Sequence, residues 1–212
     1  MLVVPLEPAS AELQVSNSRF LAELAPADSV DDARAFIAGR KAAHPEATHH
    51  VPAFVVGGGN SVVEFCSDDG EPSGTSGRPL LAVLKGSGLG NAVIVVTRWF
   101  GGTLLGTGGL VKAYSEAGKL ALASARRAVL SPSIRVAFNL PYHLYERARQ
   151  LADGSGAQVR AETFLEDVGM ELEVPVDAYP ALESRLTELA SGALQLRDLG
   201  RGVLRIAEQH PR

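Results

Sequence analysis

Apolar and polar residues near the start of the chain follow first a strand pattern and then a helix pattern. Residues 11–25 predict two strands on either side of the turn-forming Ser16-Asn17-Ser18. Downstream, Ser29 and Asp32 have the three-residue spacing of a capping box, in which each side chain bonds the backbone N–H of the other residue. The pattern therefore predicts a hairpin followed by a helix that begins just after Ser29.

Five more elements are predicted before residue 127. They are strands at 49–56, 61–66 and 92–97, a helix at 75–85, and a long helix from about 109 to about 126. Gly57-Gly58-Gly59-Asn60 separates the first two strands and is typical of a hairpin turn. The segment 92–97 is continuously apolar, which favours a central strand covered on both faces of its sheet.

Ser131-Pro132-Ser133 interrupts the pattern, and we place a domain boundary there, with domains at 1–132 and 133–212. Beyond it the predicted order is strand, helix, strand, strand, helix, strand, with Asp177 as the cap of the second helix. This βαββαβ order is the ferredoxin-like plan. The fold class expected from the pattern is α+β with two domains.

One face of the second predicted sheet is open and polar. Its residues are Arg135, Asn139, Arg160, Glu162, Glu171, Glu173, Gln195 and Arg197. An RNA-binding sheet stacks bases on aromatic side chains, and none of these residues is aromatic. A docking or regulatory role is therefore expected for this domain.

Composition places the chain among ordinary globular proteins. Of its 212 residues 46% are hydrophobic and 21% charged, enough for a core without cross-links. The single cysteine, Cys66, excludes an internal disulfide framework and fits a reducing compartment. The first ten residues lack the basic start of a signal peptide, and no apolar run reaches the roughly 20 residues that span a bilayer. We expect a cytoplasmic protein without a membrane partner.

Glycine and positive charge gather in the middle of the chain. Between Gly57 and Gly118 lie 15 of the 22 glycines, and from Pro72 to Arg135 there are eight basic residues against one acid, Glu116. The whole chain nevertheless has a net charge of −4. This asymmetry points to an anionic partner such as phosphate, nucleotide or RNA, unless folding distributes the charges over different faces.

The glycine-rich loops match no cofactor motif. Gly101 to Gly106 has the spacing of a P-loop, but Thr107 stands where the lysine belongs. Gly86-Ser87-Gly88 comes before the predicted strand at 92–97, whereas a dinucleotide-binding fingerprint follows a strand, so this segment is not such a fingerprint. What remains is either a generic anion site formed by Arg98 and the N–H groups at 108–110, or a tight turn that packs a helix on a sheet. We expect no cofactor.

Three carboxylates and two histidines are candidates for chemistry. Asp68, Asp69 and Glu71 suit a hard divalent cation, or they form a solvated turn around Gly70. His49 and His50 are adjacent on a strand, so they point to opposite faces and cannot chelate one metal together.

Several segments resemble the YigZ/IMPACT family. They are Ser18-Arg19-Phe20, Ala47-Thr48-His49-His50, Ser67-Asp68-Asp69-Gly70-Glu71-Pro72-Ser73-Gly74-Thr75, Gly77, Pro79, Val96-Thr97-Arg98, Phe100-Gly101-Gly102, Leu105-Gly106, Gly108-Gly109-Leu110-Val111 and Ala113-Tyr114. They extend over most of residues 15–125. The chain departs from the family pattern at Ser76, Trp99 and Lys112, where alanine, tyrosine and arginine are usual.

The resemblance implies an N-terminal α/β domain similar to domain IV of elongation factor G and to a ribosomal small-subunit protein domain. It also implies a ferredoxin-like C-terminal domain and a link to the regulation of translation. It supplies no catalytic residues.

Two functional hypotheses follow. The first is a translation-associated protein that binds RNA, the ribosome or a translation factor through a basic, glycine-rich face. The second is a metal-assisted phosphate-handling hydrolase that uses Asp68, Asp69 and Glu71. The residues predicted for anion or RNA binding are Thr75, Arg78, Arg98, Gly101, Gly102, Gly108, Gly109, Lys112 and Lys119. We expect Arg98, the N–H groups of Gly108 and Gly109 and the loop 68–75 to surround one groove.

Overall fold

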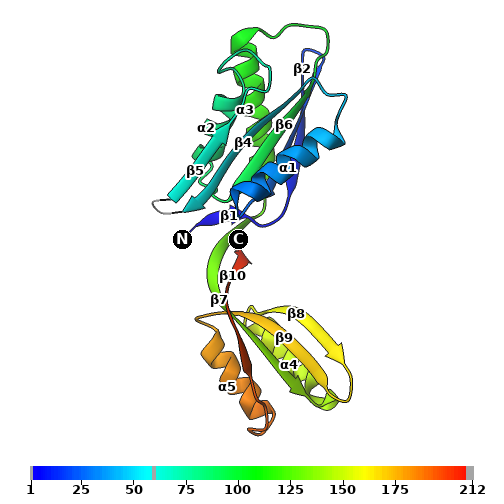
Figure 1. The fold of residues 1–212 in the computed structure, drawn as a ribbon, viewed down its shortest axis with the longest axis vertical. Coiled ribbons are helices and arrows are strands. Elements are labelled where there is room, and N and C mark those ends of the chain that lie inside the picture. The colour runs from blue at the N-terminus through cyan, green and yellow to red at the C-terminus, as the bar shows by residue number, and fades with distance from the viewer. Residues whose placement is uncertain (1, 59–60, 209–212) are drawn as a thin grey trace. The chain divides into compact units, whose positions relative to one another are not determined.

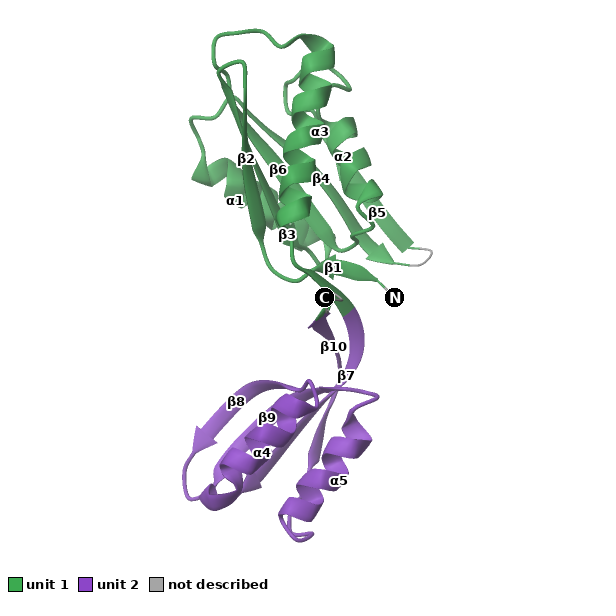
Figure 2. Ribbon diagram, turned by 180° about the vertical axis from the view of Figure 1, so that it is seen from behind, with its two compact units in different colours: residues 1–129, 207–212 green, residues 130–206 purple. Residues whose placement is uncertain are grey.

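The computed structural model describes residues 2–58 and 61–208, and it has two compact units. Unit 1 comprises residues 1–129 and 207–212, and unit 2 comprises residues 130–206 (Figure 2). Each unit contains helices and β-sheet, so the chain is an α+β protein, as predicted. In the part of the chain that the structure describes, no helix is long and apolar enough to cross a membrane.

Unit 1 is built on a five-stranded antiparallel sheet in the order β2-β3-β6-β4-β5. The strands are β2 (Ala9–Val15), β3 (Ser18–Pro26), β4 (His49–Gly58), β5 (Ser61–Cys66) and β6 (Ala92–Trp99). Val96 of β6 lies opposite Ala22 on one side and Val51 on the other. The continuously apolar segment is thus the central strand, as predicted, and it is buried on both faces.

Helices cover both faces of this sheet. Helix α1 (Val30–Ala43) lies on the face seen in Figure 1, and α2 (Gly77–Gly86) and α3 (Gly106–Ser124) lie on the face seen in Figure 2. Along β6, Val93 packs in the α1 layer, whereas Ile94 packs in the core beneath α2 and α3. The alternation of side chains along one strand therefore feeds two apolar layers.

The local signals in unit 1 are confirmed at several points. Ser16 and Asn17 have positive φ and form the turn between β2 and β3. Ser29 and Asp32 make both hydrogen bonds of the capping box at α1. A hairpin joins β4 and β5, as predicted, but Gly59 and Asn60 of its turn lie outside the described residues.

Two helix ends differ from the prediction. Helix α2 begins at Gly77, after Ser76, instead of at Thr75. The Thr75 hydroxyl donates to the carbonyl of Pro72 at 2.6 Å, which holds Thr75 in the preceding turn. Helix α3 ends at Ser124 because Ala125 is extended, so Arg126 lies beyond it.

The break predicted at Ser131-Pro132-Ser133 is wrong as a break in secondary structure. These residues lie inside a single long strand, β7 (Arg127–Leu140). The pairing of β7 with β1 (Val3–Pro5) ends at Val129, and its pairing with β9 starts at Ser133. Pro132, which has no N–H to donate, falls between these two ladders, where a strand tolerates it.

Unit 2 has the predicted βαββαβ order of elements. They are β7, α4 (Tyr142–Gly154), β8 (Gln158–Phe164), β9 (Val168–Pro175), α5 (Tyr179–Leu189) and β10 (Arg197–Ala207). The strand order is β7-β9-β8, with β10 pairing β7. Its core is separate from that of unit 1 and is made of residues such as Val136, Leu172 and Leu186. The likeness of the two units to named folds stays a prediction.

Asp177 does not cap α5, contrary to the prediction. The cap position is Ala178, which makes no side-chain cap bond, and Pro180 lies in the first turn. Because proline has no backbone N–H, the first turn of α5 has one donor fewer that would need a capping side chain.

The packing of α2 on α3 depends on a residue without a side chain. A Cβ atom built at Gly118 of α3 would lie 2.8 Å from Cδ1 of Leu80 in α2. We expect Gly118→Val to lower the free energy of unfolding by about 1–3 kcal/mol through overpacking. Gly39→Ala in α1, where a Cβ meets open space, should instead raise it by about 0.5–1 kcal/mol. Denaturant titration followed by fluorescence of the single tryptophan, Trp99, measures the free energy of unfolding of both variants. Equal values for Gly118→Val and Gly39→Ala would contradict the packing argument.

Separate cores predict that residues 1–130 fold without the rest of the chain. This fragment keeps the β1–β7 ladder and loses the hydrogen bond from the Glu208 N–H to the Arg127 carbonyl. We expect a cooperative thermal melt by Trp99 fluorescence. An insoluble fragment, or one without a cooperative transition, would show that residues 1–130 need the rest of the chain, which includes residues 207–212 of unit 1 itself.

Candidate functional site

A buried ion pair lies at the end of the sheet in unit 1. Arg98, near the end of β6, donates from Nη1 to Oε1 of Glu71 at 2.6 Å. The two side chains expose only 5% and 3% of their surfaces. Such a pair stabilises a fold only while both partners are present, because removing one leaves an uncompensated buried charge. The pair therefore holds the loop that carries Glu71 against the central strand.

Two more side chains complete this network. The hydroxyl of Tyr114, from the middle of α3, donates to the same Oε1 of Glu71 at 2.7 Å. Burial and the Glu71 carboxylate raise the pKa of Tyr114 far above its usual range, so the phenol stays protonated. Ser18 Oγ accepts hydrogen bonds from Arg98 Nη2 and from the N–H of Gly101, each at 3.2 Å. A Cβ atom at Gly101 would collide with the backbone of Asn17, so this approach requires glycine.

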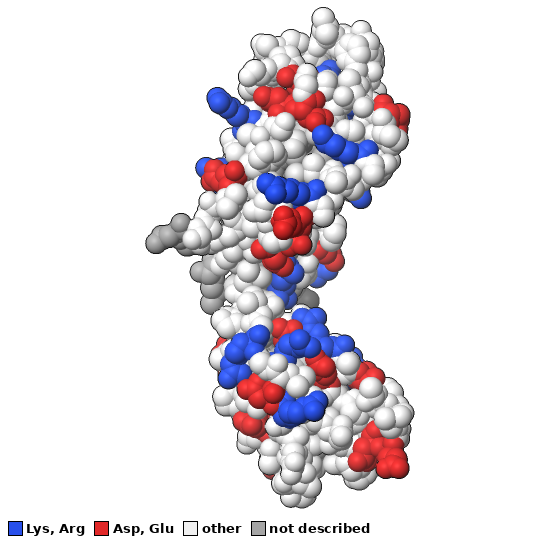
Figure 3. Space-filling view, viewed as in Figure 1, with Lys and Arg blue, Asp and Glu red and all other residues white. Residues whose placement is uncertain are grey.

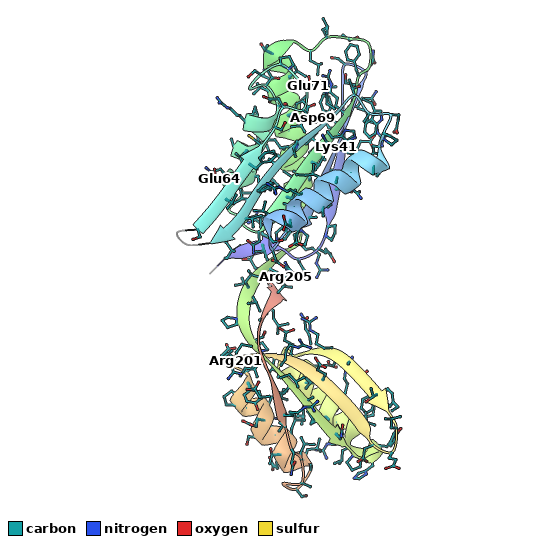
Figure 4. The ribbon with its side chains drawn as sticks, viewed as in Figure 1. Lys41, Glu64, Asp69, Glu71, Arg201 and Arg205 are labelled. Atoms are coloured by element: carbon teal, nitrogen blue, oxygen red, sulfur yellow. The ribbon has the colours of Figure 1, made fainter. Side chains whose placement is uncertain are left out.

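His49 lies beside the ion pair, and its orientation is set by the backbone. Nδ1 of His49 is 2.8 Å from the carbonyl oxygen of Asp69, which can only accept, so Nδ1 carries the proton. Nε2 is 3.9 Å from Oε1 of Glu71. The Asp69 carboxylate in turn accepts from Lys41 Nζ at 2.6 Å, and both residues are labelled in Figure 4. It also accepts from the His50 N–H at 2.7 Å.

Asp68 organises the start of α2. Its carboxylate accepts from the N–H groups of Gly74, Ser76 and Gly77 and from the Ser76 hydroxyl, at 2.8–3.2 Å. Burial by itself raises the pKa of Asp68, but these donors outweigh it and hold the pKa below its ordinary value. Asp68 thus supplies the side-chain cap that Ser76, at the cap position of α2, does not make.

A pocket of about 430 Å³ opens above the ion pair. It is lined by Thr48, His49, Gly70, Glu71, Pro72, Arg98, Phe100, Leu104, Leu105, Gly106, Thr107 and Leu110. Glu71 and Arg98 are buried members of this lining, and Gly106 and Thr107 at the start of α3 also belong to it. Phe100 and Leu104 at its rim expose 46% and 86% of their surfaces.

The structure does not bring the predicted anion-binding residues together at one place. Arg98 lines the pocket, where the loop 70–72 and the first turn of α3 also meet, but Gly108 and Gly109 do not line it. Gly101 and Gly102 lie in the loop before α3, and Thr75 is buried in the turn before α2. Arg78, Lys112 and Lys119 are exposed on α2 and α3. Arg98 faces a counter-charge, so it does not belong to an exposed basic patch.

The three predicted metal ligands do not converge. Asp68 caps α2, Asp69 binds Lys41, and Glu71 pairs with Arg98. Within residues 2–58 and 61–208, no group of three or more His, Cys, Asp or Glu side chains is arranged to hold a metal ion. Burial raises the pKa of Cys66, which disfavours the reactive thiolate.

Sequence reasoning missed Ser18, Tyr114 and His49 as parts of one network with Glu71. In the sequence, Tyr114 stands among apolar residues such as Ala113 and Ala117 of a predicted helix. A buried tyrosine hydroxyl needs a hydrogen-bond partner, so this position was the available signal. Nothing local in the sequence shows that Ser18 and Arg98 meet, because 80 residues separate them.

Comparisons with known proteins agree with the resemblance in the sequence. The Impact N-terminal domain matches residues 16–122, and a domain of unknown function, DUF1949, matches residues 138–193. The IMPACT family member YigZ of Escherichia coli K12 is 34% identical over 92% of this chain and 96% of its own length. An IMPACT family member of Haemophilus influenzae is 35% identical over 93% and 98%. A solved structure described as that of a hypothetical protein superposes with a TM-score of 0.60 at 34% identity, covering 94% of this chain and 97% of its own.

The Asp68 cap predicts a specific loss of stability. Asp68→Ala leaves three backbone N–H groups unpaired and should lower the free energy of unfolding by about 1–3 kcal/mol, measured by denaturant titration at neutral pH. Because the pKa of Asp68 is depressed in the folded state, its contribution is complete above the ordinary value of 3.8 and disappears as the pH falls through the lower, folded-state value.

The matched control is Asp31→Ala, which removes an aspartate whose side chain is 94% exposed. It should change the stability by less than about 0.5 kcal/mol. A difference between wild type and Asp68→Ala that stays constant down to pH 2 would contradict a role for the ionised carboxylate.

Proposed function

Since the chain belongs to the IMPACT family, YigZ type, we propose that it is a translation-associated protein that binds RNA, free or within the ribosome, through the α2/α3 face of unit 1. We define the α2/α3 face as the solvent side of these two helices with the first residue of β7. The resemblance of the sequence to elongation-factor and ribosomal-protein domains motivates RNA as the anionic partner. The distribution of unpaired charge carries the proposal.

The basic side chains of unit 1 form ion pairs on most of its surface, and those that form none lie on the α2/α3 face. Outside the α2/α3 face, every arginine and lysine of the described part of unit 1 has an acidic partner. The pairs are Arg19–Glu12, Arg34–Asp31, Arg40–Glu23, Lys41–Asp69, Arg98–Glu71 and Arg126–Glu7. Figure 3, which views the α1 side of unit 1, shows both signs of charge intermingled. A surface of this kind presents no coherent field to a polyanion.

The α2/α3 face differs. Arg78, Lys112, Lys119 and Arg127 form no ion pair with any acid of the described residues, and only Lys85 is paired, to Glu64. Glu116 is the one acid on α3, and it is not within ion-pair distance of Lys112 or Lys119. Unpaired basic side chains gathered on one face are the electrostatic footprint of a nucleic-acid partner.

A groove on this face offers a place for phosphate. It has a volume of about 360 Å³, and its lining includes Lys119 of α3 and Arg127 of β7. Arg127 donates from Nη1 to the carbonyl of Ser87 at 3.2 Å, which orients its guanidinium without neutralising it. Two cations beside one groove suit a phosphodiester backbone.

Salt dependence tests this proposal. In the full-length chain, Arg78→Gln, Lys112→Gln and Lys119→Gln together should weaken binding of a short fluorescent single-stranded RNA. They should also reduce the slope of log affinity against log salt by about 0.7 for each lost phosphate contact. Fluorescence anisotropy at several salt concentrations measures both quantities.

The control variant carries Arg34→Gln, Arg126→Gln and Arg201→Gln. These three arginines are exposed by 73%, 65% and 64% and are paired with acids, so the variant loses the same formal charge elsewhere. It should keep most of the wild-type slope. If the two triple variants behave alike, only net charge matters and the α2/α3 face is not the RNA surface.

A further inference from the structure

The pocket above the Arg98–Glu71 pair presents an unused carboxylate oxygen. Oε1 of Glu71 accepts from Arg98 and Tyr114, whereas no contact among the described residues uses Oε2. Glu71 lines the pocket and its side chain is 97% buried. Oε2 is not among the buried side-chain atoms that lack a partner, so solvent reaches it from the pocket, and a ligand N–H at this position would replace water with a charge-assisted hydrogen bond.

His49 adds a second acceptor to the same wall. Its Nδ1 proton is committed to the Asp69 carbonyl, so Nε2 is the ring nitrogen that offers a lone pair in this tautomer. Nε2 is 3.9 Å from the Glu71 carboxylate, and His49 also lines the pocket. Because Arg98 already balances the charge of Glu71, the polar part of the pocket suits a neutral ligand edge with two N–H donors.

The rest of the pocket is apolar and partly exposed. Pro72, Phe100, Leu104, Leu105 and Leu110 make its walls and rim. Exposed apolar side chains beside a pocket mark a binding site, and an exposed phenyl ring is a platform on which a flat heterocycle stacks. The walls therefore suit an aromatic ligand body.

Helix α3 begins at this pocket without a cap. Its cap position is Leu105, which makes no side-chain cap bond, and the first residues, Gly106 and Thr107, line the pocket. The unpaired N–H groups and the positive end of a helix of 19 residues favour an anionic group such as a phosphate. This feature adds to the Glu71 and His49 side chains, which line the same pocket.

We propose that this pocket binds one unpaired nucleotide, with guanine donating to Glu71 Oε2 and His49 Nε2, Phe100 beside the base, and the 5′-phosphate at the start of α3. Guanine is the base that presents two adjacent N–H donors, at N1 and at the 2-amino group. Adenine, cytosine and uracil each present one donor group on the same edge. A pocket of about 430 Å³ lies within the usual range for ligands of this size. The inference deepens the proposed RNA binding, and the nucleotide is either free or part of RNA.

Titration of GMP into the full-length chain tests the base. We expect saturable binding by calorimetry, with IMP, which lacks the 2-amino group, about tenfold weaker through the loss of one hydrogen bond. AMP, CMP and UMP should bind more weakly than GMP. No binding of GMP, or equal binding of all five nucleotides, overturns the proposal.

The phosphate position has its own variant. Thr107→Glu places a carboxylate in the first turn of α3, at an exposed position where negative charge favours the helix, and it should weaken GMP at least tenfold by repulsion. Thr107→Gln, of similar size, should keep the wild-type affinity, and guanosine should bind both variants equally. Unchanged GMP affinity in Thr107→Glu overturns the phosphate placement. Glu71→Gln also removes the counter-charge of buried Arg98 and so lowers stability. Its GMP affinity is therefore compared with that of the Thr107 variants only after a thermal melt shows that it is folded.

The two proposals fail separately. The variant with Arg78→Gln, Lys112→Gln and Lys119→Gln should bind GMP like wild type, because none of these residues lines the pocket. If the chain selects GMP but that variant binds RNA like wild type, the proposed RNA surface is wrong and the nucleotide pocket stands. If RNA binding depends on the α2/α3 face but the chain does not select GMP, only the nucleotide pocket is wrong. Hairpin RNAs with one unpaired G or A in the loop show whether the bound nucleotide is part of RNA or free. Tighter binding of the G hairpin supports a nucleotide within RNA. Equal binding of the two hairpins, together with selectivity for GMP, supports a free nucleotide.

Discussion

The buried contact between Arg98 and Glu71 is the constraint on which the loop end of unit 1 depends. It ties the central strand β6 to the loop between β5 and α2, and Tyr114 adds the long helix α3 through the same carboxylate oxygen. Loss of one partner of such a pair costs about 3–5 kcal/mol, because a charge is left without compensation in a dry environment. One carboxylate thus positions three elements and leaves a second oxygen facing the pocket.

The same contact changes the meaning of the basic segment. In the sequence, Arg98 counts toward an excess of positive charge between residues 72 and 135. In the folded chain its charge is used internally, and the exposed excess shifts to Arg78, Lys112, Lys119 and Arg127. The α2/α3 face is therefore distinguished by basic residues of which, within the described residues, all but Lys85 lack an acidic partner. The density of basic residues along the chain is a weaker guide.

The acidic loop follows a similar logic. Asp68, Asp69 and Glu71 look alike in the sequence and suit a metal site by residue type. Each instead meets a different donor set: Asp68 caps α2, Asp69 binds Lys41 and the His50 N–H, and Glu71 meets Arg98 and Tyr114. Carboxylates with committed donors organise a loop, which explains how a glycine-rich segment holds a defined shape beside the pocket.

The sequence alone determined the features that depend on neighbours a few residues apart. These include the turn at Ser16-Asn17, the capping box at Ser29 and Asp32, the doubly buried strand at 92–97 and the βαββαβ order of unit 2, because hydrogen bonding and side-chain alternation over short distances set them. Only the tertiary structure decided the rest. Pro132 continues a strand because it falls between two ladders, and α2 starts at Gly77 because Asp68 supplies its cap. Arg98 meets Glu71 and Ser18 across 27 and 80 residues, a meeting that depends on how the strands pair and that no local pattern encodes.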